Sequence, residues 1–275
     1  MLSINSAAEI PDLARDYADV TLIAAPTTAE RIAGKPVPYI HDLLKALRQA
    51  CVSHGAPLAD CTVGIINADI HLRIPANRIG ALTDAARYGL VLGPRVDVPT
   101  AEAMDRFTPT GKETYAVGYD YFLMSAAMLD DFNDSPFCIG MPFWDYWMPL
   151  MAMLKGRPLT AVLAPVALHV DHETQWDNSI YVFFHALIAD VFEVCRKHKE
   201  QGTSAQARQF DLLYDILSHV YSDVFARGTQ AGSENASNEA AITALATFYD
   251  RLQEVVVHHI KTNVCSLTFP MGSAS

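Results

Sequence analysis

Two patterns of apolar residues alternate along the first 180 residues, and each predicts a different element. Short continuous apolar runs are typical of buried strands, whereas apolar residues at i, i+3 and i+4 are typical of helices. The runs predict strands at residues 19–25, from 62 into 67, 89–93, 117–124 and 159–169. The helical spacing predicts helices at residues 38–53, 75–88, 126–132 and 144–155. This alternation indicates an α/β fold with a mostly parallel central sheet flanked by helices.

The pattern changes after about residue 178. Residues 181–199, 204–227 and 238–259 all have helical periodicity, and a Gly/Ser/Asn-rich linker occupies 228–237. We therefore expect a sheet domain at 1–178 and a helical C-terminal extension at 179–275. Amphipathic helices of this kind could shape an acceptor site, form a homodimer or dock onto a partner enzyme.

Composition narrows the class of protein. Of the 275 residues 51% are hydrophobic and 19% are charged, and the net charge is −11. An acidic chain of this kind disfavours nucleic-acid binding, which needs a basic surface. The N-terminus lacks a signal-peptide pattern, no apolar run approaches the ~20 residues that span a bilayer, and the five cysteines form no CxxC pair. We expect a cytoplasmic protein.

The apolar run that begins at Thr62 ends in Asn67-Ala68-Asp69. Ligands of open α/β sheets bind where such strands end, and carboxylate and amide oxygens are ligands for Mg²⁺ or Mn²⁺. A β-turn in which Asn and Asp merely end the strand is the alternative, and the motif alone favours the turn.

Asp145 stands at the start of a predicted helix between Trp144 and Trp147. A carboxylate there is favoured by the helix dipole and could accept a proton from an attacking hydroxyl, while the two indoles could stack on a sugar. Equally, Asp145 could be an ordinary first-turn residue beside two core tryptophans.

His169-x-x-His172 follows the last predicted strand. Neutral imidazoles are good ligands for Mn²⁺-type metals, and the segment lacks the HExxH pattern of zinc proteases. The chain also has no GxGxxG, no Walker P-loop and no GxSxG, which disfavours dinucleotide-dependent dehydrogenases, P-loop NTPases and α/β-hydrolases.

The order of these motifs resembles that of bacterial glycosyltransferase-like proteins of the GT-A type. That family has N-[AS]-D-I, G-x-D-[YV]-F, F-x-I-G-x-P-x-[WY]-D-x-W and H-x-x-H segments. They correspond here to Asn67–Ile70, Gly118–Phe122, Phe137–Trp147 and His169–His172. The resemblance covers roughly residues 19 to 177, and the tryptophan–aspartate segment is its most specific part.

The resemblance implies transfer of a sugar from a nucleotide-diphospho-sugar donor to the hydroxyl of a sugar or glycan acceptor, with Mn²⁺ or Mg²⁺ on the diphosphate. Asp69, with His169 and His172, would bind the metal, and Asp145 would be the catalytic base. The donor would contact Thr27, Asn67, Asp69, Arg95, Asp120, Trp144 and Trp147.

Two other functions stay open at this point. A catalytically degenerate member of the same fold would bind a nucleotide, a sugar or a partner protein without transfer, since the metal motif opens with Asn67 in place of an aspartate. A nucleotidyltransferase would need a glycine-rich basic loop near the N-terminus, and residues 24–35 are a poor candidate.

Overall fold

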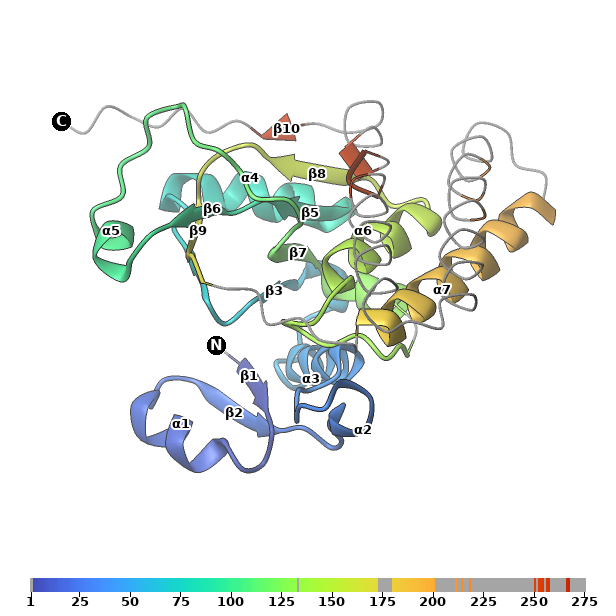
Figure 1. Ribbon diagram of the computed structural model, residues 1–275, viewed down its shortest axis with the longest axis horizontal. Helices are drawn as coiled ribbons and strands as arrows, with labels where there is room; N and C mark the ends of the chain where they lie inside the picture. The colour runs from blue at the N-terminus through green and yellow to red at the C-terminus, as the bar shows by residue number, and fades with distance from the viewer. Residues whose placement is uncertain are drawn as a thin grey trace, which may run out of the picture.

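The computed structural model describes residues 2–132, 134–172 and 180–200, together with positions 211, 214, 218, 250, 252–254, 256–257 and 266–267. Within these residues, helices and strands form a mixed α/β fold whose strands belong to three sheets (Figure 1). The α/β class predicted from the alternation of strands and helices is confirmed.

The largest sheet has five strands. Their spatial order is β10 (Ser266–Leu267), β8 (Leu159–Val162), β5 (Leu90–Gly93), β7 (Tyr121–Ser125) and β3 (Thr62–Ile66). The β10–β8 and β8–β5 pairs are parallel, whereas β7 is antiparallel to both of its neighbours, β5 and β3. The sheet is mixed, so the prediction of a mostly parallel sheet is wrong. An apolar run such as Tyr121–Ser125 looks the same in either direction, and the long polar segment before it lets the chain reverse.

A smaller sheet carries the residues of greatest chemical interest. Its order is β4 (Ile70–Leu72), β9 (Ala167–Val170) and β6 (Val96–Val98), with β4–β9 antiparallel and β9–β6 parallel. The single strand predicted at 159–169 is in fact two strands, β8 and β9, in different sheets. Pro165 lies in the break, where the missing N–H interrupts strand pairing. Because of this break, β9 lies beside β4 and β6.

The helices predicted at 38–53, 75–88, 144–155 and 181–199 are found as α3 (Ile40–Ser53), α4 (Ala76–Tyr88), α6 (Trp144–Leu154) and α7 (Ile180–Glu200). A short helix, α5 (Ala101–Asp105), lies between β6 and β7. Two 3₁₀ turns, η1 (Leu58–Asp60) and η2 (Ala126–Asp131), flank β3 and β7, and η2 replaces the α-helix predicted at 126–132.

The five-stranded sheet separates two hydrophobic clusters, because neighbouring side chains of a strand point to opposite faces. Leu90 and Leu92 of β5 pack with α3, α6 and α7 on one face. Val91, between them, packs on the other face against Leu82 and Ala86 of α4. The middle strand β5 is therefore covered on both faces and wholly buried.

The N-terminal segment stands apart from the five-stranded sheet. It contains β1 (Leu2–Asn5), α1 (Ile10–Asp16), β2 (Thr21–Ala24) and α2 (Glu30–Ala33), and β1 pairs with β2 in a parallel two-stranded sheet (Figure 1). The strand predicted at 19–25 exists, but within the described residues it pairs with β1 only. Thr27 follows it and is exposed.

Of the predicted C-terminal extension, α7 is described, and the helices predicted at 204–227 and 238–259 lie mostly outside the described residues. Phe183, Phe184 and Leu187 of α7 are fully buried in the same cluster as α6. In the part of the chain that the structure describes, no helix has the length and apolar character needed to cross a bilayer.

Candidate metal centre

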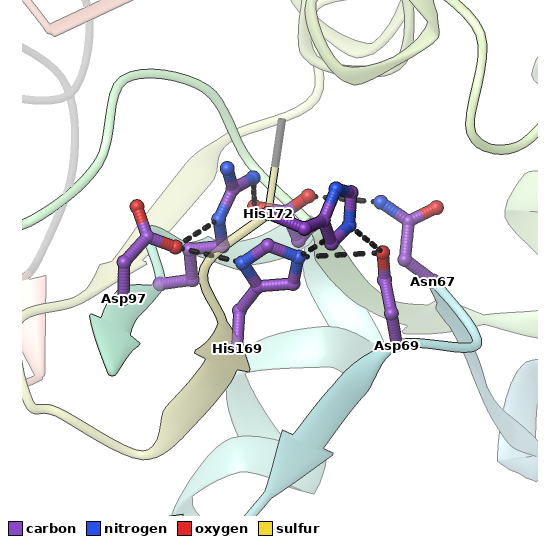
Figure 2. Close-up of polar contacts among 7 residues, drawn as sticks. Asn67, Asp69, Asp97, His169 and His172 are labelled. Atoms are coloured by element: carbon purple, nitrogen blue, oxygen red, sulfur yellow. Dashed lines mark hydrogen bonds and ion pairs between the residues drawn. The ribbon is translucent and has the colours of Figure 1, made fainter. Parts of the chain in front are cut away.

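The strand end that carries Asn67 and Asp69 is a turn between two sheets. Strand β3 ends at Ile66 and β4 begins at Ile70, and the Ile70 N–H donates to the carbonyl of Asn67 over 3.2 Å. The turn alternative is therefore correct for the backbone. It leaves the side chain of Asp69 51% exposed and directed to the end of β9 (Figure 2).

Two histidines meet Asp69 there. Asp69 Oδ2 lies 3.4 Å from Nε2 of His169 and 3.6 Å from Nε2 of His172, and the two Nε2 atoms are 3.2 Å apart. Figure 2 shows the three side chains turned toward one another from β9, the segment after it and the β3–β4 turn. We call Asp69, His169 and His172 the Asp/His cluster. Each of the three residues offers one ligand atom, and these atoms all lie within 4.8 Å of one another, so they could bind one metal ion.

The spacing of the Asp/His cluster fits a divalent cation. Zinc-like ions bind nitrogen and oxygen at about 2.0–2.2 Å, which places neighbouring ligand atoms about 3.0–3.5 Å apart in octahedral or tetrahedral sites. The three separations, 3.2, 3.4 and 3.6 Å, lie in or next to this range. Two imidazoles favour a transition-metal ion over Mg²⁺, whose preferred ligands are oxygens.

Asp97 on β6 holds the buried member of the cluster. Its Oδ1 lies 2.8 Å from Nδ1 of His169, a ring that is only 6% exposed. Oδ1 of Asp97 also accepts a hydrogen bond of 2.8 Å from Nε of Arg95. Burial alone would raise the pKa of Asp97, but the contacts with Arg95 and His169 outweigh it and hold that pKa below its ordinary value.

Arg95 continues the contacts to a second carboxylate. Its Nη1 donates to Oδ2 of Asp120 over 2.8 Å, and Oδ1 of Asp120 accepts from Nδ2 of Asn67 over 2.8 Å. Burial lowers the pKa of Arg95, but Asp120 and Asp97 outweigh that effect and hold it above its ordinary value. We call Asn67, Asp120, Arg95 and Asp97 the Arg95 network. It connects the turn that bears Asp69 to the strand that bears His169.

Asp145 lies at the start of α6, close to the same network. Helix α6 begins after Phe143, whose φ of +74° turns the chain sharply. Gly118, with φ +100°, lies against the carboxylate, and a Cβ there would be 2.5 Å from Oδ2 of Asp145. Burial raises the pKa of Asp145 to about 7, the charge of Asp120 adds to this, and backbone N–H groups including that of Tyr146 act in the opposite direction.

Three residues predicted to contact the donor lie elsewhere. Trp144 and Trp147 are 3% and 0% exposed in the hydrophobic core, and Trp147 Nε1 donates to Asp190 of α7. The structure thus places both indoles where neither offers a face to a sugar. Thr27 is exposed beside the separate two-stranded sheet.

Asp97 is the site residue that the sequence reasoning did not single out. Val96 and Val98 of β6 are buried and Asp97 between them is exposed. Because side chains alternate along a strand, Arg95 and Asp97 project to the same side. The sequence feature that could have identified Asp97 is its i, i+2 spacing from Arg95, alternating with Val96 and Val98.

No protein-family model, curated protein sequence or solved structure matches this chain.

Proposed function

We propose that this chain is a metal-dependent glycosyltransferase of the GT-A type, which moves a sugar from a nucleotide-diphospho-sugar to an acceptor hydroxyl. The observation that carries the proposal is convergence. Residues of three separate sequence motifs lie in contact: Asn67 with Asp120, and Asp69 with His169 and His172. Asp145 is joined to them through the charge of Asp120. The GT-A resemblance implies that these motifs share one site. They are far apart in the sequence, so their closeness in the fold does not follow from sequence order.

In this proposal the Asp/His cluster holds the divalent cation. A bound cation would offset the negative charge that builds up on the departing diphosphate. The cluster itself supplies one formal negative charge, from Asp69, and two neutral donors. Ligands of this kind leave most of the cation's charge available to an anionic substrate.

Asp145 is the proposed base. Its pKa of about 7 lies near neutral pH, where a carboxylate both exists in ionised form and retains the basicity to take a proton from a hydroxyl. Asp145 lies in the first turn of α6, where backbone N–H groups donate to its carboxylate. Asp145 would accept the acceptor's proton as the new glycosidic bond forms.

The test is nucleoside diphosphate release. The full chain is incubated with a panel of nucleotide-diphospho-sugars, simple sugar acceptors and Mn²⁺, and the released nucleoside diphosphate is measured. We expect release that EDTA abolishes and Mn²⁺ restores. Asp69→Ala should remove the metal-dependent activity together with metal-dependent donor binding.

Asp145→Asn should lower transfer at least 100-fold while donor affinity stays within about 2-fold, because the base acts on the acceptor. Asp84→Asn, the same change at an exposed position on α4, is the matched control and should leave transfer unchanged. Full transfer by Asp145→Asn would contradict the assignment of the base.

One observation supports a second function, a protein that binds a nucleotide or sugar and catalyses no transfer. Arg95, a cation connected to the Asp/His cluster through Asp97, is already held by Asp97 and Asp120. A diphosphate would have to compete with two carboxylates for it. Thermal-shift measurements with nucleoside diphosphates separate the two functions: Mn²⁺-dependent stabilisation without turnover of any donor would favour the non-catalytic protein.

A further inference from the structure

Polar contacts connect the Arg95 network to the Asp/His cluster at His169, and the backbone of the β3–β4 turn connects the two again between Asn67 and Asp69. From His169, contacts of 2.8 Å lead to Asp97, Arg95, Asp120 and Asn67 in turn. Asn67 stands in the same turn as Asp69, and Asp69 returns to His169 over 3.4 Å. Figure 2 shows Asp97 on one side of the two histidines and Asp69 and Asn67 on the other.

We infer that Asp97 is a positioning residue of the metal centre, which fixes the ring of His169 for metal binding and is itself held by Arg95. The inference rests on the metal-binding part of the proposed function and not on sugar transfer.

The tautomer of His169 follows from the contact with Asp97. A carboxylate only accepts hydrogen bonds, so the Nδ1 atom 2.8 Å from Oδ1 must carry the proton. In a neutral imidazole the other nitrogen then has the free lone pair. That nitrogen, Nε2, is the atom that faces Asp69 and His172. Asp97 thereby presents His169 to a cation in the form that binds one.

Exposure distinguishes His169 from the other two ligands. Its side chain is 6% exposed, against 51% for Asp69 and 60% for His172. Two exposed side chains can adjust to an incoming ion, whereas a buried ring keeps the orientation that its neighbours impose. His169 is therefore the fixed point of the cluster, and the contact that orients it governs the whole site.

Arg95 gives Asp97 its own orientation. The guanidinium donates Nε–H to Asp97 and Nη1–H to Asp120, each over 2.8 Å, and Asp120 is 6% exposed. Two carboxylates on one planar fork have little freedom to rotate. Folding already orders the two carboxylates, so metal binding does not have to supply the conformational entropy cost of ordering them.

The experiment titrates the full chain with Co²⁺ alone and follows the visible absorption bands of the bound ion. We expect Asp97→Ala to weaken Co²⁺ binding 10- to 100-fold, the range found when such outer contacts of metal-bound histidines are removed. Asp97→Asn keeps an acceptor oxygen of the same shape, so its loss should be smaller than that of Asp97→Ala. Should the alanine variant fold poorly in a thermal melt, the asparagine variant carries the test.

Asp171→Asn is the matched control. It removes one negative charge two residues from His169 and leaves the Asp97 contact intact, so Co²⁺ binding should stay within about 2-fold of the unmodified chain. An equal loss in Asp171→Asn and Asp97→Ala would mean that charge alone matters and would overturn the inference.

Histidine ¹⁵N chemical shifts give a second measurement that needs no metal. His169 should have its proton on Nδ1 in the unmodified chain and in Asp171→Asn, and should lose this preference in Asp97→Ala. Wild-type Co²⁺ affinity in Asp97→Ala, or no Co²⁺ binding by the unmodified chain, overturns the inference. Weakened Co²⁺ binding in Asp97→Ala, from a chain that transfers no sugar, would support it and contradict only the proposed transferase activity.

Discussion

Asp145 is a carboxyl group that the fold holds in its neutral form across several pH units. In the unfolded chain it ionises near its ordinary pKa of 3.8, whereas burial raises its pKa to about 7 in the folded chain. Between these values the unfolded chain releases a proton that the folded chain keeps. Asp145 therefore lowers the stability of the fold progressively as pH rises from about 4 to 7, and the full penalty remains at higher pH.

Replacing Asp145 with asparagine should remove this penalty. Since each pKa unit corresponds to about 1.4 kcal/mol, we expect Asp145→Asn to raise the free energy of unfolding by about 2 kcal/mol or more at pH 8. Near pH 4 the gain should nearly vanish. Urea denaturation at both pH values measures it, with exposed Asp84→Asn as the control, expected within about 0.5 kcal/mol. A gain that is equal at both pH values would show that Asp145 is not held neutral.

The residues of the site were predictable from sequence to different degrees. Motif spacing identified Asp69, His169 and His172 as potential ligands, because such chemistry requires a small set of residue types. Trp144 was predicted to face a sugar and is instead in the core. An aromatic residue at helical spacing is equally compatible with packing and with stacking on a ligand, and only the direction of the helix decides between them.

At the scale of elements, helices were located best and strand pairing worst. Helix α4 was predicted at 75–88 and occupies Ala76–Tyr88, because a helix is closed by bonds within its own segment. A strand is completed by partners that are distant in sequence, so the apolar run at β7 revealed neither its direction nor its neighbours. For the same reason the three-stranded sheet, which brings His169 beside Asp69, was not predicted.

The segment before β7 depends on glycine at position 118. An alanine there would combine a φ of +100° with a Cβ 2.5 Å from Oδ2 of Asp145. Gly111 is a matched control, because its φ is +77° and a Cβ there would meet nothing within 4 Å. We expect Gly111→Ala to cost about 1 kcal/mol from backbone strain, and Gly118→Ala to cost about 2–3 kcal/mol because the clash adds to it.

Urea denaturation of both glycine variants measures the difference. Gly118→Ala should also lower transfer, because the clash displaces the carboxylate of Asp145, whereas Gly111→Ala should not. Equal costs for the two substitutions would mean that Gly118 and Asp145 are not in close contact.

At the scale of the whole molecule, α7 belongs to the packing of the site and not only to the C-terminal region. Phe184 of α7 is fully buried, and its ring centroid lies 5.8 Å from that of Phe143, the residue that precedes α6. Asp190 of α7 accepts from Trp147 of α6. The helix that presents Asp145 is thus held from behind by α7, across the predicted domain boundary at 178.

This packing predicts that residues before and after 178 unfold together. Phe184→Ala should lower the free energy of unfolding by about 3–5 kcal/mol, as expected for removing a buried aromatic ring, and should shift the transition seen by Trp144 and Trp147 fluorescence.

Val182→Ala is the control on the same helix: its side chain is 39% exposed, and the change should cost no more than about 0.5 kcal/mol. All three tryptophans of the chain, Trp144, Trp147 and Trp176, precede residue 178, so the midpoint of their fluorescence transition follows the unfolding of the predicted sheet domain. If Phe184→Ala leaves that transition unchanged, α7 folds as part of an independent extension. A shift common to tryptophan fluorescence and helical circular dichroism would mean that the core behind Asp145 is completed only by a helix beyond that boundary.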